Sequence, residues 1–279
     1  MSGTPKDSHY ARLRRTYRDN QPGDGAPKPH QKQAKHPYQN PPKERIHLYG
    51  LHTVRAALDN PARRIEYLRV TRNALARLEI DNLEALPFEA RIVEPREIDA
   101  IVGEDAVHQG VLAEARPLKT KPLSQLGKTN LVLVLDQVTD PHNVGAIMRS
   151  AVAFGVGALV TTNRHSPQES GVLAKAASGA LEHLDHIEVK NLAQALEELS
   201  EAGFQTIGLD SEGPAILEET FASPKIALVL GAEGKGLRQK TRETVNALAR
   251  LDMPGAIQSL NVSNAAAIAL YAARRHAAR

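Results

Sequence analysis

Apolar and polar positions alternate in two ways along residues 130–279. Short apolar runs predict strands at 131–135, 158–161, 187–189, 205–209 and 226–230. Between these runs apolar residues recur every three or four positions, which predicts helices at 143–154, 173–181, 192–202 and 237–246. The runs 131–135 and 226–230 are apolar throughout, as in strands that are buried on both faces. This alternation predicts a mostly parallel sheet with helices on both of its faces.

A smaller α/β unit is predicted over residues 46–115. Its strands are expected at 65–70, 90–93 and 111–115, with a helix at 95–102. Residues 47–58 contain one glycine and then the pattern of a short helix that ends at Asn60-Pro61. Residues 116–129 contain two prolines and no long periodic pattern, so they are interpreted as the linker to the second domain, 130–279.

The first 45 residues differ from the rest in composition. They hold ten Lys or Arg, four Asp or Glu and seven of the 17 prolines, which gives a net charge of +6. The whole chain carries +3, so residues 46–279 carry −3. With very few branched aliphatic residues, residues 1–45 are expected to form a disordered basic arm. Such an arm is typical either of a salt-dependent contact with nucleic acid or of a solubilising tail.

Composition also excludes several kinds of protein. The chain has no cysteine, which excludes disulfides and thiolate metal sites. No apolar run reaches the length of a membrane-spanning helix, and the N-terminus lacks an apolar signal region. We therefore expect a cytoplasmic protein without membrane contact. The eleven histidines form no metal-ligand pattern, so no metal is expected.

The segment 136–151, DQVTDPHNVGAIMRSA, is the first with candidate chemistry. Asp140-Pro141 predicts a turn, and Asn143 is placed to cap the helix that follows. Arg149 stands among alanine, isoleucine, methionine and valine, where its charge needs a partner. A structural salt bridge would supply that partner, and so would a bound phosphate or carboxylate.

The glycine-rich segment 230–237, LGAEGKGL, lies between a predicted strand and a predicted helix. Its three glycines permit unusual backbone angles and the close approach of a ligand. Glu233 departs from the GxGxxG pattern of dinucleotide sites, and the GK[ST] of a P-loop is absent. A carboxylate at this place suits a cationic partner, such as Arg149 or a sulfonium.

The segment 251–264, LDMPGAIQSLNVSN, precedes an alanine-rich helix. It concentrates four small polar side chains, Ser259, Asn261, Ser263 and Asn264, at the start of that helix. Capping a helix uses only one or two such residues, so the surplus predicts a binding loop. This loop and those after residues 135, 209 and 230 follow strands, and ligands of parallel sheets bind at the carboxyl ends of strands.

Taken together, these segments resemble the SpoU (TrmH) family of RNA ribose 2′-O-methyltransferases. The resemblance lies in Asn143 with Arg149, the Gly-x-Glu-x-x-Gly of 231–236 and the Ser259–Ser263 segment before a helix, in this order. Ala106-Val-His-Gln-Gly110 resembles the branch that methylates guanosine in 23S ribosomal RNA. The resemblance covers residues 46–276.

The resemblance implies a C-terminal α/β-knot (SPOUT) methyltransferase domain, preceded by a small α/β domain like ribosomal protein L30e that binds the RNA substrate. It also implies the cofactor S-adenosylmethionine, bound by the loops 209–213, 230–236 and 251–260, and a homodimer. The residues expected to line the cofactor are Leu209, Gly231, Leu251, Met253, Leu260 and Ser263. For Leu251 and Leu260, an ordinary place in the core is the alternative.

The expected catalytic residues are Arg149, Asn143, Glu233, Ser259 and Asn261. Arginine is effectively always protonated, so Arg149 is expected to clamp a phosphate and developing oxyanion charge rather than to act as a free base. Glu233 is expected to orient Arg149 or another cation, and the remaining residues to position backbone, arginine and ribose.

Two alternatives stay open at this point. A tRNA 2′-O-methyltransferase is a neighbouring possibility, against which the separate first domain and Ala106–Gly110 argue. A non-catalytic RNA-binding or ribosome-assembly factor of the same fold is the other, and the joint presence of Asn143, Arg149, Glu233 and Asn261 argues against it.

Overall fold

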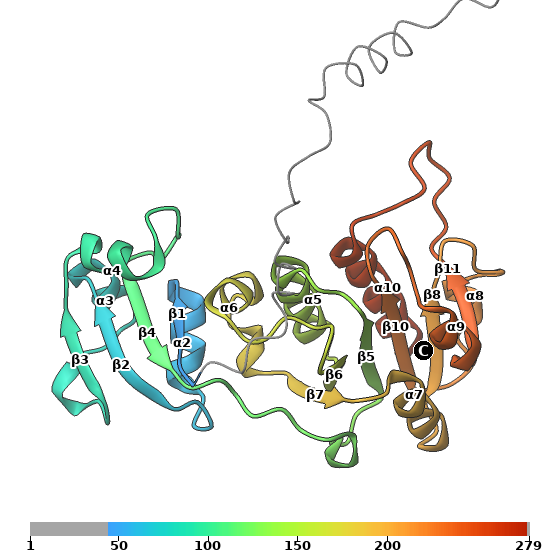
Figure 1. The fold of residues 1–279 in the computed structure, drawn as a ribbon, viewed down its shortest axis with the longest axis horizontal. Coiled ribbons are helices and arrows are strands. Elements are labelled where there is room, and N and C mark those ends of the chain that lie inside the picture. The colour runs from blue at the N-terminus through green and yellow to red at the C-terminus, as the bar shows by residue number, and fades with distance from the viewer. Residues whose placement is uncertain (1–43, 278–279) are drawn as a thin grey trace, which may run out of the picture. The chain divides into compact units, whose positions relative to one another are not determined.

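The computed structural model describes residues 44–277 (Figure 1). The predicted disordered arm, 1–45, therefore lies outside the described residues except for Glu44 and Arg45.

Residues 46–115 form a four-stranded sheet in the order β1-β4-β2-β3. β4 runs antiparallel to β1 and β2, and β3 runs parallel to β2. The elements are β1 (Ile46–Tyr49), α2 (Leu51–Asp59), β2 (Ile65–Val70), α3 (Arg72–Arg77), η2 (Leu83–Ala85), β3 (Glu89–Ile92), α4 (Pro95–Val102) and β4 (Val111–Ala115). The strands predicted at 65–70 and 111–115 and the helix at 95–102 are confirmed.

Strand β1 and helix α3 were not predicted. β1 has only four residues and passes directly into α2 through Gly50, whose φ of 90° turns the chain. The helical pattern that begins one residue later concealed this strand. α3 is a six-residue helix, too short to show a recurring apolar face.

The second domain contains a seven-stranded sheet in the order β7-β6-β5-β10-β8-β11-β9, in which every pair is parallel (Figure 1). The strands are β5 (Leu131–Asp136), β6 (Ala158–Thr162), β7 (Asp185–Val189), β8 (Gln205–Leu209), β9 (Ala215–Ile216), β10 (Ile226–Gly231) and β11 (Ala247–Arg250). The helices are η3 (Leu123–Gln125), α5 (Pro141–Ala153), α6 (Gly171–Ala177), η4 (Ala180–Glu182), α7 (Leu192–Glu201), α8 (Leu217–Thr220), α9 (Gln239–Thr244) and α10 (Val262–Ala277). The predicted parallel sheet is confirmed.

Both faces of this sheet are buried, as the continuous apolar runs predicted. On β5, Leu131 and Leu133 belong to the core shared with α5, α6 and α10, whereas Val132 and Val134 belong to the core shared with α7. Successive side chains of a strand point to opposite faces, so one apolar run serves both cores.

Two predicted helices end differently from the prediction. The helix expected at 173–181 is interrupted after Ala177, because Ser178 and Gly179 adopt left-handed backbone conformations with φ of 51° and 94°. Of the helix expected at 237–246, only Gln239–Thr244 is helical, and the four residues from Ala247 form β11. A four-residue strand with only its third residue fully buried gives little periodic signal.

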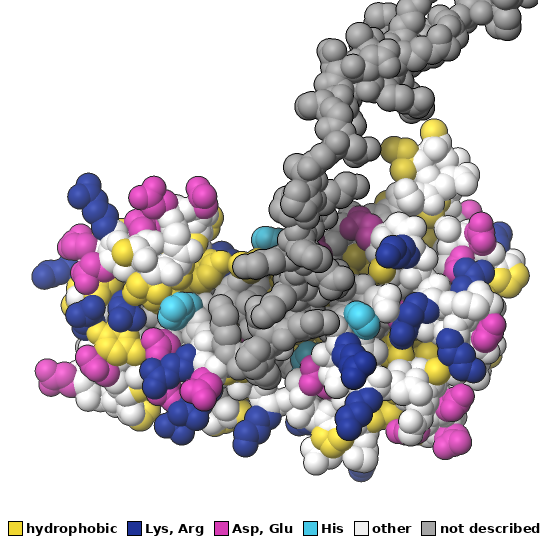
Figure 2. All heavy atoms as spheres, in the orientation of Figure 1, with side chains coloured by type: hydrophobic (Ala, Val, Ile, Leu, Met, Phe, Trp, Pro, Cys, Tyr) yellow, Lys and Arg dark blue, Asp and Glu magenta, His cyan; other side chains and the backbone are white. Residues whose placement is uncertain are grey.

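Basic and acidic side chains are interspersed on the face of the described chain shown in Figure 2. Among residues 44–277 no helix has both the length and the apolar character that crossing a bilayer requires. Within the same residues, no group of three or more His, Asp or Glu side chains is placed to hold a metal ion.

Candidate active site

The carboxyl ends of four adjacent strands lie at one edge of the parallel sheet. Their register places Asp136 beside Gly231, Leu230 beside Leu209, and Leu209 beside Ala249. The polar loops that follow these strands therefore begin side by side, and their predicted convergence is confirmed. Residues far apart in the sequence can meet at this edge.

Three of the predicted catalytic side chains are joined by hydrogen bonds at this edge. The Asn261 amide nitrogen donates to Oδ1 of Asn143 at 3.0 Å and lies 3.5 Å from Oε1 of Glu233. The Asn143 amide nitrogen donates to Oε2 of Glu233 at 3.3 Å. Each pair forms a side of one triangle, so α5, the glycine-rich loop and the start of α10 are tied together through side chains alone.

Asn261 also organises the beginning of α10. Its Oδ1 accepts the backbone N–H of Ser263 at 2.8 Å and the Ser263 hydroxyl at 2.6 Å. The first N–H groups of a helix have no partner within the helix, and this oxygen supplies one. The predicted capping role of a polar residue at this helix thus belongs to Asn261.

The capping role expected for Asn143 was wrong. Asp140, not Asn143, caps α5: its Oδ1 accepts the His142 N–H at 3.0 Å, and Pro141 occupies the first helical position. Asn143 lies in the first turn, where its side chain is free to bind Glu233. Within the described residues the carboxylate of Glu233 is bound by the amides of Asn143 and Asn261, and the orienting of a cation by Glu233 stays a prediction.

Arg149 is exposed on α5, and its side chain makes no ion pair or hydrogen bond with any residue of 44–277. The structural salt bridge, one of the two readings of this residue, is therefore absent from the described chain. A guanidinium that is neither buried nor paired keeps all of its donors available for an anion.

The glycine-rich loop is shaped by its backbone. A Cβ atom at Gly231 would lie 2.1 Å from the carbonyl carbon of Gly236, so only glycine fits at that position. Gly234 and Gly236 have φ of 75° and 64°, a region that favours glycine. The N–H of Gly236 donates to the carbonyl of Ala232 at 2.8 Å and closes the turn. Glu233 is thereby presented at the tip of a tight loop.

Two carboxylates that sequence reasoning did not select hold these loops. Asp136, fully buried at the end of β5, accepts from the backbone N–H of Arg238 at 3.0 Å and from its Nε at 2.6 Å. Asp210, after β8, binds the guanidinium of Arg242. The sequence did contain one signal for these two residues. A carboxylate that directly follows an apolar strand is expected to be buried, and a buried charge requires a partner.

The remaining predicted residues lie along the same edge without a side-chain hydrogen bond among them. Leu209 ends β8 and is half-buried, and Leu251 packs against the main core while staying partly exposed. Met253 is half-buried, Ser259 is exposed, and the side chain of Leu260 is 40% exposed. The alternative of ordinary core therefore fails for Leu260.

These residues fit the cofactor that the resemblance implied. The backbone groups of residues 252–260 make no hydrogen bond with any other described residue, so N–H and C=O groups are available to the polar edge of a base. Apolar surface of Leu251, Met253 and Leu260 lies beside them. A planar base with apolar faces and a polar edge, such as the adenine of S-adenosylmethionine, matches that combination.

Comparison with known proteins agrees with this geometry. Residues 130–271 match the SpoU rRNA Methylase family, and residues 47–121 match the RNA 2′-O ribose methyltransferase substrate binding domain. The 23S rRNA (guanosine-2′-O-)-methyltransferase RlmB of Pseudomonas putida is 36% identical over 239 residues, covering 82% of this chain and 95% of that protein. Its counterpart from Ralstonia nicotianae is 39% identical over 236 residues, covering 82% and 94%.

Solved structures agree in fold. The SpoU methyltransferase AviRb from Streptomyces viridochromogenes, in complex with AdoMet, has a TM-score of 0.70 at 21% identity and covers 84% of this chain and 90% of its own. An AdoMet-bound rRNA methyltransferase from Sinorhizobium meliloti has a TM-score of 0.70 at 24% identity and covers 84% and 88%. The predicted fold class, an α/β-knot methyltransferase domain after a small α/β domain, is confirmed, and the chain belongs to the SpoU rRNA methylase family.

Proposed function

We propose that this protein transfers a methyl group from S-adenosylmethionine to the ribose 2′-hydroxyl of a guanosine in 23S ribosomal RNA. The observation that carries the proposal is the triangle of Asn143, Glu233 and Asn261 at the carboxyl edge of the sheet, with Arg149 unpaired on the same helix as Asn143. The substrate is inferred from the two relatives that are 36% and 39% identical to this chain, both named 23S rRNA (guanosine-2′-O-)-methyltransferase RlmB. The matched region covers 95% and 94% of their length. Their bacterial origin supports the cytoplasm as the place of action.

The cofactor supplies a methyl group on a sulfonium, and the protein has to hold the acceptor hydroxyl in line with it. Arg149 is assigned to a phosphate next to the target ribose and to negative charge that develops on the 2′-oxygen, while the hydroxyl proton passes to that phosphate as the new O–C bond forms. A fixed cation placed there lowers the energy of the charged transition state without itself losing a proton.

The amide–carboxylate triangle is assigned to holding the shape of the site. Glu233 fixes the glycine-rich loop against α5 and α10 through Asn143 and Asn261. Ser263 keeps Asn261 in its orientation, and the exposed hydroxyl of Ser259 is free to bind ribose. Gly231, Leu209, Leu251, Met253 and Leu260 are assigned to the cofactor pocket.

Arg149→Ala tests the assignment. Transfer of labelled methyl to 23S rRNA transcripts should be lost, by at least about a hundredfold in kcat. Cofactor affinity, measured by calorimetry, and the melting temperature should stay near wild type, because Arg149 is exposed and its side chain makes no hydrogen bond or ion pair with the described residues. Near-normal turnover of the variant would contradict the clamp.

The same assay separates the alternative functions. Methylation of tRNA but not of 23S rRNA by the wild-type protein would favour the tRNA enzyme. RNA binding without transfer to any RNA would favour an assembly factor. Mapping 2′-O-methyl groups in ribosomal RNA from cells with and without the gene would then identify the nucleotide.

We also propose that the protein is a homodimer built on α10. One side of this helix is buried through Val262, Ala266 and Leu270, while Ile268 and Tyr271 on another side remain 45% and 56% exposed. Large apolar side chains at neighbouring positions of an exposed helix face are typical of a surface that another subunit covers. Sedimentation equilibrium should give twice the chain mass of 30.3 kDa, and a monomeric mass at micromolar concentration would refute the dimer.

A further inference from the structure

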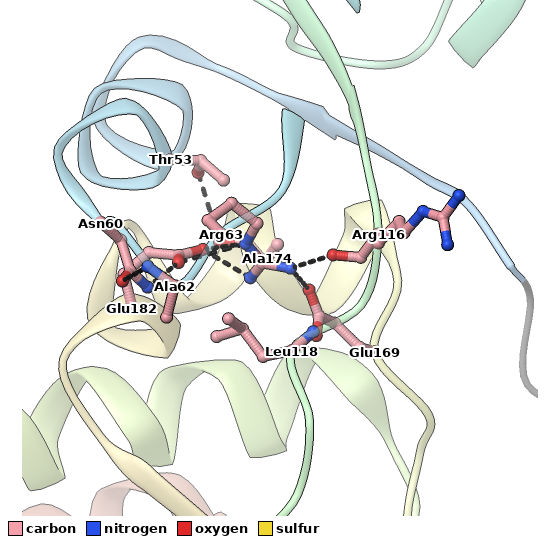
Figure 3. Close-up of polar contacts among 9 residues, drawn as sticks. All are labelled: Thr53, Asn60, Ala62, Arg63, Arg116, Leu118, Glu169, Ala174 and Glu182. Atoms are coloured by element: carbon pink, nitrogen blue, oxygen red, sulfur yellow. Dashed lines mark hydrogen bonds and ion pairs between the residues drawn. The ribbon is translucent and has the colours of Figure 1, made fainter. Parts of the chain in front are cut away.

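Arg63 stands out because it is a fully buried arginine remote from the site described above. It lies in the turn between α2 and β2, and its side chain has 0% exposure. A buried guanidinium is costly unless every donor finds an acceptor. Figure 3 shows that residues from three separate parts of the chain surround Arg63, and two of those parts supply acceptors for its Nε, Nη1 and Nη2 groups.

Two carboxylates of the methyltransferase domain receive most of these donors. Nη2 of Arg63 donates to Oε1 of Glu182 at 2.6 Å and Nε donates to Oε2 at 3.2 Å, while Nη1 donates to Glu169 at 2.6 Å. The side chains of Glu182 and Glu169 are themselves 1% and 12% exposed. This fork of two parallel bonds to one carboxylate and one to the other is a geometry that lysine cannot reproduce.

The linker between the domains is held by the same group. Nη1 of Arg63 also donates to the carbonyl of Arg116 at 2.8 Å, and the second oxygen of Glu169 accepts the N–H of Leu118 at 2.8 Å. The amide of Asn60 donates to Glu182 at 2.7 Å. We call Arg63, Glu169 and Glu182 the interdomain cluster. Burial raises the pKa of Glu169, and the Arg63 guanidinium and the Leu118 N–H act in the opposite direction.

The two carboxylates of the interdomain cluster stand on either side of α6. Glu169 comes two residues before this helix begins at Gly171, and Glu182 closes the short helix η4 that follows it. α6 in turn packs closely on α5: a Cβ atom at Gly145 would lie 2.6 Å from the carbonyl oxygen of Leu173. Arg63 is therefore connected through a single helix to the helix that carries Asn143 and Arg149.

We propose that Arg63 is a positioning residue for the RNA substrate: through Glu169 and Glu182 it fixes the substrate-binding domain to α6, and so determines which ribose of a bound RNA reaches α5. The inference rests on the proposed function, because it concerns RNA held by the first domain. The fixed connection matters because a misplacement of about 1 Å costs on the order of a hundredfold in rate.

The test compares Arg63→Lys and Glu169→Gln with the matched control Arg64→Lys. Arg64 is the next residue along, but its side chain is 67% exposed and pairs with Glu66 at the surface. Lysine at position 63 keeps the charge but has three donors on one atom, so it cannot reproduce the fork to Glu182 together with the bonds to Glu169 and to the Arg116 carbonyl; glutamine at position 169 keeps the shape while removing the charge. Glu169→Gln is the milder change and serves if Arg63→Lys lowers stability too far for assay.

If Arg63 positions the RNA, both variants should give the same set of results. Cofactor affinity should stay within about twofold of wild type, kcat/KM for 23S rRNA should fall at least about tenfold, and methyl groups should appear on riboses other than the target. Hydrogen exchange at the Leu118 amide should accelerate, because its acceptor is disturbed. The control should change none of these values.

Other results would overturn the inference. If exchange at Leu118 accelerates while kcat/KM and the methylated position stay unchanged, the interdomain cluster has no part in presenting RNA. If cofactor affinity and activity fall together in proportion to stability, Arg63 only supports folding. A wild-type protein that does not methylate 23S rRNA would instead refute the proposed function, before any variant is compared.

Discussion

At the scale of single residues, Asn261 has two separable functions. Its carbonyl oxygen accepts two bonds from Ser263 and caps α10, while its amide nitrogen faces Asn143 and Glu233. Asparagine is suited to this place because one side chain offers both an acceptor and two donors. An aspartate in its place could still cap the helix but could donate nothing to the other two residues.

This separation gives a prediction from two variants. Asn261→Asp should keep most of the stability, because the cap remains, but should lose methyl transfer and weaken the cofactor, since a second carboxylate would face Glu233. Asn261→Ala should lose the cap as well and lower the free energy of unfolding by about 1–2 kcal/mol. Urea denaturation and cofactor calorimetry on both variants would measure the two effects. Equal loss of stability in both would show that the two functions are not separable.

At the scale of elements, the sequence predicted those whose pattern repeats. The strand at 205–209 and the helix at 95–102 match the structure to the residue, because apolar periodicity extends over their whole length. The strands β1 and β11 were not predicted, because a four-residue strand depends on packing rather than on periodicity. The end of α6 before residue 181 was not predicted either, because it depends on the left-handed backbone of Ser178. Contacts between the residues of the site also depend on packing, so periodicity does not predict them.

For the site, the residue types and their order were predictable and the partners were not. Asn143, Glu233 and Asn261 were selected from motifs in the sequence, and the structure joins them by hydrogen bonds. The cap of α5 was assigned to Asn143 because asparagine favours that position, although Asp140 stands before a proline and fits better. Which side chain meets which was decided by the register of parallel strands, a long-range property.

The close contact of α5 and α6 leads to a prediction about Gly145. Alanine there would place a methyl group 2.5 Å from Cβ of Ala176 and 2.6 Å from the Leu173 carbonyl oxygen, so the helices must separate. Gly145→Ala should lower the free energy of unfolding by about 2–3 kcal/mol and reduce kcat as α5 moves. Gly127→Ala is the matched control, because no atom lies within 4 Å of its added Cβ. Equal melting temperatures of the two variants would contradict close packing as the reason for Gly145.

At the scale of the whole molecule, polar and apolar contacts join the domains besides the linker. The interdomain cluster is polar, and a single hydrophobic core includes Leu48 and Val54 of the first domain together with Leu173 and Ala174 of α6. Thr53 adds a hydrogen bond of 3.2 Å from its hydroxyl to the Ala174 carbonyl. The first domain, which matches the RNA 2′-O ribose methyltransferase substrate binding family, is thus built against α6, the helix that packs on the α5 of the proposed catalytic residues.

The last prediction concerns residues 1–44, which precede the two domains. Residues 1–44 carry nine Lys or Arg and four Asp or Glu, so their removal leaves a chain of net charge −2 where the full chain has +3. Binding to RNA releases counterions in proportion to the phosphates contacted, by about 0.7 per contact for single strands. Deletion of 1–44 should therefore weaken binding of 23S rRNA fragments most at low salt and flatten the plot of log K against log salt.

Filter binding at several salt concentrations would measure the slopes for the full chain and for the truncated chain, with cofactor affinity as the control for folding. An unchanged slope would leave residues 1–44 without a role in RNA binding and would favour a solubilising tail.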